Sequence, residues 1–236
     1  MKVVILCGGL GTRLSEETSV KPKPMVKIGN KPILQHIINL YSKYGYREFI
    51  LALGYKGYFI KNYFKKKIDK KIKIELVNTG KNTLTGGRLL RLKNFFKKDE
   101  DFMLTYGDGV SNQNITKLRN FHNKSKKIAT MTVVRPPIRF GEVKLKKNLI
   151  VSFKEKPQSS DSWINGGFFV FNSKIFDYIK NDKTMLEKEP LEMLQKKREL
   201  MAFKHEGFWQ CMDTLREKNY LNTLYKENKL KWLNSK

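Results

Sequence analysis

The chain has 236 residues, of which 40% are hydrophobic, and this predicts one globular domain over residues 1–236 and excludes a disordered chain. The formal net charge of +26 comes mostly from scattered lysines, without an arginine-rich helix, an RNA-binding aromatic motif or zinc-ligand spacing. We therefore expect a solvated basic surface and no specific nucleic-acid partner, with a polyanion ligand as the alternative. The apolar runs are too short for a membrane helix or a signal peptide, so we expect a cytoplasmic protein with no membrane partner.

Short apolar runs alternate with amphipathic helical patterns from the N-terminus to Val134, which is typical of a mainly parallel sheet with crossover helices. The predicted strands are Val3–Cys7, Glu48–Leu53, Lys73–Val77, Asp101–Tyr106 and Ile128–Val134. The predicted helices are Pro32–Tyr44, Tyr58–Phe64, Gly87–Phe96 and Ile115–His122.

The pattern changes after Val134, where shorter strands are expected to flank a substrate rather than extend the core. These strands are Phe140–Leu145, Leu149–Phe153 and Ile164–Phe171. Two helices (Phe176–Ile179 and Glu187–Lys196), a strand (Leu200–Phe203) and a closing helix from Leu215 complete the prediction. No repeat or linker divides the chain.

The first predicted strand runs directly into Gly8-Gly9-Leu10-Gly11-Thr12-Arg13-Leu14. Glycines at this place let backbone N–H groups approach phosphates, because no Cβ is in the way. The spacing fits neither the P-loop nor the dinucleotide fingerprint, and a plain tight turn is the alternative. Arg13 can form forked bonds to phosphate oxygens, and Lys23, held between Pro22 and Pro24, adds a point charge. The segment predicts a triphosphate loop with Arg13 and Lys23 as its cations.

Two aspartates are candidates for a metal site. Asp108 lies between glycines at the end of a strongly apolar strand, where open α/β sheets bind their ligands. Asp213 comes immediately before the last predicted helix. Because Mg²⁺ takes one or two carboxylates together with phosphate oxygens and waters, this pair fits it. The alternatives are an aspartate in a turn for Asp108 and a helix N-cap for Asp213.

Two later motifs are weaker signals. A lysine fixed before a proline, Lys156-Pro157, can hold a second phosphate, and Asn165-Gly166-Gly167 can bring backbone and amide groups to sugar hydroxyls. An ordinary turn and an edge strand are the alternatives. No nucleophile–base pair stands out, and the three histidines have no metal-ligand spacing. This inventory suits phosphoryl chemistry, which needs positioning and charge neutralisation more than a base.

Taken together, these motifs resemble the sugar-1-phosphate nucleotidyltransferase family. The resemblance covers nearly the whole chain and includes Pro22-Lys23-Pro24-Met25, Gly107-Asp108, Glu155-Lys156-Pro157 and Asn165-Gly166-Gly167. It implies a single-domain, Rossmann-like α/β/α nucleotidyltransferase fold, with a mixed, mainly parallel central sheet and a smaller sheet that flanks the substrate. Further phrases, such as Thr85-Gly86-Gly87-Arg88-Leu89 and Phe208-Trp209-Gln210-Cys211-Met212-Asp213-Thr214, resemble the members that transfer a cytidylyl group from CTP to glucose 1-phosphate.

The resemblance also implies roles for individual residues. Mg²⁺ is expected at Asp108 and Asp213, and the sugar phosphate at Gly107, Lys156, Asn165 and Gly166. The nucleotide is expected at Leu6, Gly8, Gly9, Gly11, Thr12, Arg13 and Lys23, with its base at Thr85 and Gly86. Arg13 and Lys23 are also the expected catalytic residues.

The resemblance leaves several alternatives open. The first is the same chemistry with UTP, dTTP or GTP, or with another phosphorylated acceptor. The second is a catalytically silent binding module, against which the retained Arg13, Lys23, Asp108, Lys156 and Asp213 argue. The family implies a homo-oligomer and a pathway to a bacterial surface polysaccharide. The interval between Phe64 and Val77 is shorter here than in the family, which leaves the oligomeric state and the exact sugar open.

Overall fold

A seven-stranded mixed sheet forms the centre of the protein in the computed structural model, which describes residues 1–66, 71–136, 142–154 and 162–232. The strand order is β12-β8-β11-β6-β1-β4-β5. Every neighbouring pair is parallel except the two that involve β11, which runs antiparallel to β6 and β8. The strands are β1 (Val3–Cys7), β4 (Glu48–Leu53), β5 (Lys73–Asn78), β6 (Asp101–Tyr106), β8 (Ala129–Val134), β11 (Ile164–Asn172) and β12 (Leu200–His205).

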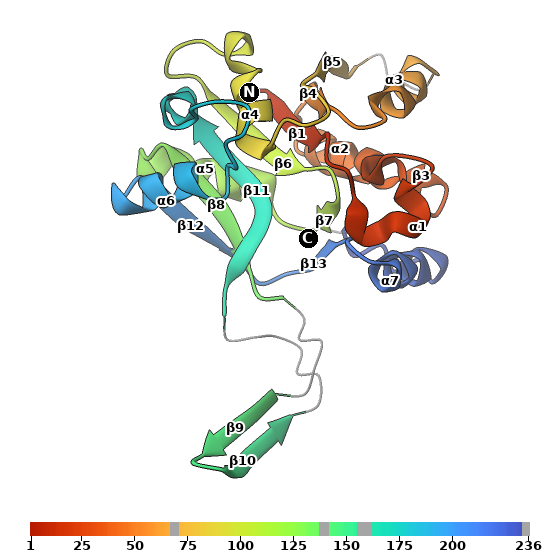
Figure 1. Cartoon of the computed structure of the whole chain (residues 1–236), viewed down its shortest axis with the longest axis vertical. Coiled ribbons are helices and arrows are strands. Elements are labelled where there is room, and N and C mark those ends of the chain that lie inside the picture. Colours follow the sequence, from red (N-terminus) through yellow and green to blue (C-terminus); the bar gives the residue numbers. More distant parts are fainter. Residues whose placement is uncertain (67–70, 137–141, 155–161, 233–236) are drawn as a thin grey trace.

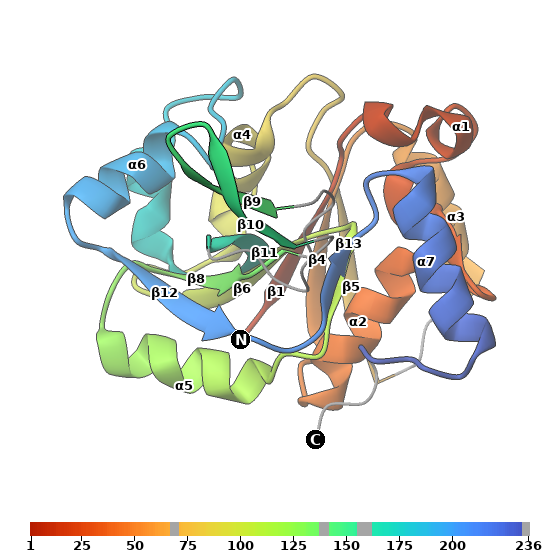
Figure 2. The same cartoon turned by 90° about the horizontal axis from the view of Figure 1, so that it is seen from below.

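Helices cover both faces of this sheet, so the protein has the three layers that were predicted (Figure 2). Strand β1 shows why: Val3, Ile5 and Cys7 pack into one apolar cluster, and Val4 and Leu6 pack into the other. A strand buried on both faces reads as a continuous apolar run. The first cluster includes α2 (Ile33–Lys43), α3 (Gly57–Lys66), α5 (Ile115–Ser125) and α7 (Leu215–Lys226). The second includes α4 (Thr85–Leu90), η4 (Ser173–Tyr178) and α6 (Glu189–Lys196).

In the part of the chain that the structure describes, three two-stranded sheets lie outside the central sheet. They pair β2 (Lys27–Ile28) with β3 (Lys31–Pro32), β7 (Gly109–Ser111) with β13 (Trp209–Cys211), and β9 (Glu142–Lys146) with β10 (Leu149–Lys154). Figure 1 shows the β9–β10 hairpin apart from the rest of the protein. The remaining short helices are η1 (Thr12–Leu14), α1 (Ser15–Thr18), η2 (Lys23–Met25) and η3 (Lys93–Phe95).

The prediction that Ile164–Phe171 flanks the substrate outside the core is wrong. This strand, β11, lies inside the central sheet between β6 and β8, and its residues from Gly166 to Phe171 are buried. A strand buried on both faces of a sheet reads as a continuous apolar run, as Phe168–Phe171 does. The start of β11 nevertheless reaches the site, as described below.

Two predicted helices also differ from those observed. Gly87–Phe96 was predicted as one helix, whereas α4 ends at Leu90 and the 3₁₀ helix η3 follows. The hydrogen bonds from Leu92 N–H to Leu89 O and from Phe95 N–H to Leu92 O show the tighter 3₁₀ pattern. The predicted helix at Phe176–Ile179 corresponds to the end of the 3₁₀ helix η4, which stops at Tyr178.

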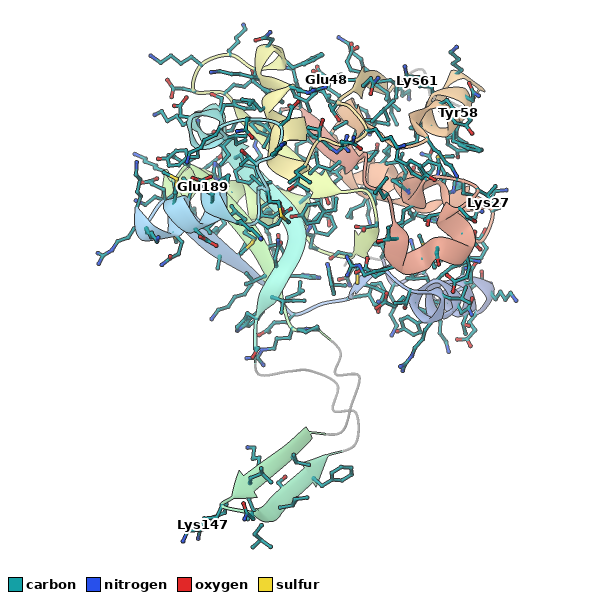
Figure 3. The ribbon with its side chains drawn as sticks, viewed as in Figure 1. Lys27, Glu48, Tyr58, Lys61, Lys147 and Glu189 are labelled. Carbon is teal, nitrogen blue, oxygen red and sulfur yellow. The ribbon has the colours of Figure 1, made fainter. Side chains whose placement is uncertain are left out.

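The basic surface is distributed over the protein. Lys27, Lys61 and Lys147 are all exposed, and they lie on different parts of the surface in Figure 3. Within the described ranges, no helix combines the length and apolar composition that a membrane span requires.

Candidate active site

A cavity of about 710 Å³ opens where β1 and β6 end. This is the edge at which open α/β sheets bind their ligands. Most of the predicted site residues line it: Leu6, Gly8, Gly9, Gly11, Thr12, Arg13, Lys23, Thr85, Gly107, Asp108, Asn165, Gly166 and Asp213. Gly86 does not contribute to the lining, and Lys156 lies outside the described residues. The fold thus brings together segments that are far apart in the sequence.

The glycine loop after β1 is a fixed turn. Gly11 has φ 71°, in the left-handed region, and a Cβ there would lie 2.7 Å from Thr18 Cγ2. The Thr18 hydroxyl donates to Gly11 O (3.0 Å), and so does Leu14 N–H (3.0 Å). A Cβ on Gly9 would have no atom within 4 Å, so the backbone at Gly9 faces open space that can accommodate a phosphate.

A charged cluster lies next to this loop, where Lys23 and two aspartates converge. Lys23 Nζ is 2.7 Å from Asp108 Oδ2 and also contacts Asp213 Oδ1. Arg13 Nη1 contacts the other oxygen of Asp213 at 2.8 Å, while its side chain stays 75% exposed. Burial alone would lower the pKa of Lys23, but Asp108 and Asp213 outweigh it and raise this pKa above its usual value. Lys23 is therefore a fixed, buried positive charge in the wall of the cavity.

Both aspartates are held by backbone structure. The β7–β13 ladder places Gly109 opposite Cys211, and Met212 N–H donates to Asp108 O (2.8 Å). Asp213 is not the N-cap of α7, so this alternative is wrong. Thr214 is the N-cap, and it forms a capping box with Glu217. The Asp213 carboxylate is therefore directed to the cavity rather than used as a cap.

Glu217 fixes the backbone at Asp213, and this leads to a stability prediction. Its Oε2 accepts the N–H groups of Asp213 (2.7 Å) and Thr214 (2.9 Å). Glu217→Ala removes this acceptor and should lower the free energy of unfolding by about 0.5–2 kcal/mol, the usual effect of losing a helix cap. Glu217→Gln keeps an acceptor oxygen and should behave nearly as the wild type. Urea unfolding checks both; equal losses in the two variants would contradict the capping role.

The two aspartates offer a donor set that fits a hard divalent cation. Asp108 lies between β6 and β7 and Asp213 between β13 and α7, and their oxygens already share one cationic partner, Lys23 Nζ. Among the described residues, no cluster of three or more His, Cys, Asp or Glu side chains forms a closed metal cage. Mg²⁺ needs no such cage, because phosphate oxygens and waters complete its shell.

A second polar network, centred on Glu187, lines the cavity. Tyr106 donates its hydroxyl proton to Glu187 Oε1 (2.5 Å), and Thr85 donates its own to Glu187 Oε2 (2.6 Å). Burial, together with the negative charge of Glu187, raises the pKa of Tyr106, so its hydroxyl remains a donor. The carboxylate is thereby oriented beside Asn165, whose Nδ2 lies 3.5 Å from the Tyr106 hydroxyl.

Thr85 and Gly86, which are expected to bind the base, both form hydrogen bonds within the protein. The Thr85 hydroxyl accepts Leu186 N–H (2.9 Å) and donates to Glu187, and Gly86 N–H donates to Thr184 O (3.0 Å). A Cβ on Gly86 would lie 2.8 Å from Thr184 O. The glycine therefore permits close packing of α4 against this segment.

The start of β11 carries the predicted sugar-binding residues. Asn165 Oδ1 accepts Gly167 N–H (2.8 Å), and Gly166 O accepts the indole N–H of Trp209 (2.7 Å). Gly167 has φ 76°, and a Cβ there would lie 2.7 Å from Tyr106 Cδ2. A tight, side-chain-supported turn thus holds the Asn165 amide at the cavity wall.

The other reactive side chains of the cavity do not suggest covalent chemistry. Cys7 and Cys211 both line it, and burial raises the pKa of each thiol, to about 12 for Cys211. Neutral thiols are poor nucleophiles. His36 is buried on α2, with Nε2 3.0 Å from Ile28 O, as expected for a packing histidine.

Sequence reasoning missed several cavity residues, among them Arg88, Glu187, Trp209 and Glu217. Glu187 had no local signal, because one carboxylate near a helix start looks like any other. Arg88 stands in a phrase that carried the resemblance, but nothing in its spacing indicated a buried guanidinium. The Trp209 indole is directed by its bond to Gly166, 43 positions away in the chain.

Comparison with known proteins identifies the family. Residues 2–223 match the family model described as nucleotidyl transferase. The chain belongs to the nucleotidyl transferase family. It is 48% identical to glucose-1-phosphate cytidylyltransferases of Salmonella typhimurium and Salmonella typhi, over 98% of this chain and 98% of each relative. Each alignment spans 253 positions, more than the 236 residues of this chain, so these relatives carry residues that it lacks.

The solved structure of UDP-glucose pyrophosphorylase from Acinetobacter baumanii shares the fold, with a TM-score of 0.77 at 18% identity, covering 98% of this chain and 95% of that one. The predicted family and fold class are therefore confirmed for this nucleotidyltransferase. Nucleotidyltransferases of this family generally use a divalent metal, which agrees with the paired aspartates.

Proposed function

We propose that the protein is a glucose-1-phosphate cytidylyltransferase, which converts CTP and α-D-glucose 1-phosphate to CDP-glucose and pyrophosphate. The observation that carries this proposal is the convergence of Arg13, Lys23, Asp108 and Asp213 beside the glycine loop. This is a site for bringing two anions together. The 48% identity to glucose-1-phosphate cytidylyltransferases supports the choice of substrates. We treat residues 1–236 as one catalytic domain.

In the proposed reaction, an oxygen of the sugar phosphate attacks the α-phosphorus of CTP. A new P–O bond forms, the bond from the α-phosphorus to the bridging oxygen breaks, and pyrophosphate leaves with the electron pair. The attacking oxygen is already ionised at neutral pH, so the site needs no general base, and neither cavity cysteine takes part. The chain has to align the two phosphates and neutralise their charge.

The glycine loop and its cations serve the triphosphate. The backbone at Gly9 lies open to a phosphate, and the exposed Arg13 guanidinium can form two parallel bonds to phosphate oxygens. The buried Lys23 ammonium supplies a fixed positive charge for the leaving pyrophosphate. Asp108 and Asp213 would hold Mg²⁺, and when bound this ion offsets negative charge on the phosphates.

On the acceptor side, Gly107, Asn165 and Gly166 line the cavity close to Glu187. An amide and an oriented carboxylate present both donors and acceptors, which is the pattern that sugar hydroxyls require. Lys156 is proposed to hold the sugar phosphate. A cytoplasmic homo-oligomer in the synthesis of a surface polysaccharide remains part of the proposal, supported by the family resemblance.

A substrate panel tests the proposed function. We expect CTP to be the best donor, UTP a poorer one and purine nucleotides worse still, because cytosine and uracil share O2 but differ at position 4. Glucose 1-phosphate should be the preferred acceptor. Pyrophosphate release measured with four nucleoside triphosphates and several sugar 1-phosphates decides the matter. A higher kcat/KM with dTTP or GTP would replace the cytidylyl assignment with the alternative donor and leave the transferase chemistry.

A further inference from the structure

Arg88, on helix α4, is a buried cation whose contacts no part of the proposed mechanism uses. Its side chain lines the cavity, yet the residue is only 4% exposed. Its guanidinium donates to acceptors in three segments of the chain. These acceptors are Gly8 O (2.8 Å), Leu53 O (3.3 Å), Thr79 Oγ1 (2.9 Å), Gly80 O (2.6 Å) and Lys81 O (3.2 Å).

All of these acceptors are neutral. No salt bridge among the described residues includes Arg88, whereas Arg91, next to the end of the same helix, pairs with Asp182 at the surface. Burial, with a smaller effect from Arg91, lowers the pKa of Arg88, but a guanidinium stays protonated in proteins. Burying a charge without a carboxylate partner is unfavourable unless hydrogen bonds compensate it. The five acceptors provide that compensation.

Two glycines leave the space that this guanidinium fills. A Cβ on Gly8 would lie 2.2 Å from Arg88 Nη1, and a Cβ on Gly54 would lie 2.5 Å from the same atom. Neither glycine has a positive φ, so backbone conformation does not explain them. Gly9, the next residue of the loop, has nothing within 4 Å of its Cβ position. Gly8 is therefore a glycine because of Arg88, whereas Gly9 faces the open cavity.

The bonds of Arg88 connect two separate segments that contribute to the cavity wall. Gly8 directly follows β1 and begins the predicted triphosphate loop, while Gly80 and Lys81 lead into Thr83–Thr85, which also line the cavity. A planar guanidinium with several fixed donors can hold two such segments at a set separation, which the single ammonium of a lysine cannot do.

We propose that Arg88 is a positioning residue that sets the triphosphate loop through Gly8 and fixes its separation from the loop at residues 80–84. The proposal rests on the proposed function only for the identity of the nucleotide. Its central claim is that one buried side chain couples the conformation of the glycine loop to nucleotide affinity.

Kinetics of Arg88→Lys and Arg88→Met test this claim, with Arg91→Lys as the matched control from the same helical region. Both Arg88 variants should raise KM for the nucleotide about 10- to 100-fold, the range for losing hydrogen bonds to a charged group, and change KM for the sugar phosphate far less. Arg91→Lys should leave both constants unchanged. Equal rises of both KM values, or unchanged nucleotide binding in folded Arg88→Met, would overturn the proposal.

A second measurement needs no substrate and separates this proposal from the proposed function. Gly8→Ala should lower Tm strongly in the wild-type background, and by much less when Arg88→Ala has removed the guanidinium. Gly9→Ala should leave Tm nearly unchanged. Thermal unfolding of the four members of the Gly8/Arg88 cycle gives the coupling, and nucleotide titration of those that fold gives its link to binding. Additive effects of the two substitutions on Tm would refute the Gly8–Arg88 contact, even if the substrate panel had identified CTP. Coupled effects on Tm without weaker nucleotide binding would leave Arg88 with a structural role only, and would also overturn the proposal.

Discussion

Asp108→Asn and Asp213→Asn should each lower kcat by about 100-fold or more. Mutating a residue that only orients a metal ligand typically costs about 10- to 100-fold in metal affinity or activity, and these aspartates are proposed to bind the metal directly. Each substitution removes a formal negative charge from the pair that converges on Lys23. Asparagine retains the size of the side chain and one oxygen, so the fold should survive. Initial rates at saturating substrates and a range of Mg²⁺ concentrations measure the effect. EDTA should abolish wild-type activity, because the charge of the triphosphate is then left without its counterion.

The control for this experiment is Asp182→Asn. Asp182 is a half-exposed aspartate whose carboxylate binds Arg91 at the surface, away from the charged cluster. It should keep the wild-type kcat and the wild-type Mg²⁺ dependence. Turnover near the wild-type level in Asp108→Asn would contradict the proposed metal site, whatever happens in the control.

Much of the parallel half of the fold could be predicted from the sequence, because its signals are local. Strand β1 is buried on both faces, and its five consecutive apolar residues indicate this burial in the sequence itself. The glycine loop and Asp108 directly follow strands, so the carboxyl-edge rule for open sheets predicts Asp108 at the ligand-binding edge. The pairing of Asp108 with Asp213 came from the family resemblance.

The rest depended on contacts between distant segments. Strand β11 was misplaced because a short apolar run after an irregular region gives no information about its neighbours in a sheet. The Glu187 network joins residues 81 and 102 positions apart. Position 8 requires a glycine because Arg88, 80 positions away in the chain, fills the space that a side chain would need. Sequence patterns indicate that a glycine is needed, whereas only the packed structure shows which group requires the space.

Lys23→Ala and Lys156→Ala should affect different steps of the reaction. Lys23→Ala should lower kcat, because an interaction with the leaving pyrophosphate strengthens in the transition state. Losing one charge-assisted contact corresponds to about 1.5–3 kcal/mol, or roughly 10- to 150-fold in rate. The structure adds a second expectation: with the ammonium gone, Asp108 and Asp213 lose their shared cation. Divalent metal should then bind the substrate-free variant more tightly than the wild type, which Mn²⁺ titration by electron paramagnetic resonance measures.

Lys156→Ala should instead raise KM for glucose 1-phosphate by a similar factor and leave the binding of CTP nearly unchanged. This expectation comes from its place before Pro157 in the motif that resembles the sugar-phosphate site of the family. Lys27→Ala and Lys147→Ala are matched controls, since both lysines are exposed and lie on different parts of the surface (Figure 3). Neither should change any of the constants, because exposed charges contribute little to binding at a distance in salt. Steady-state kinetics with each substrate varied in turn separate the two effects. A Lys156→Ala variant with weaker CTP binding and an unchanged KM for the sugar phosphate would show that the two halves of the site are divided differently.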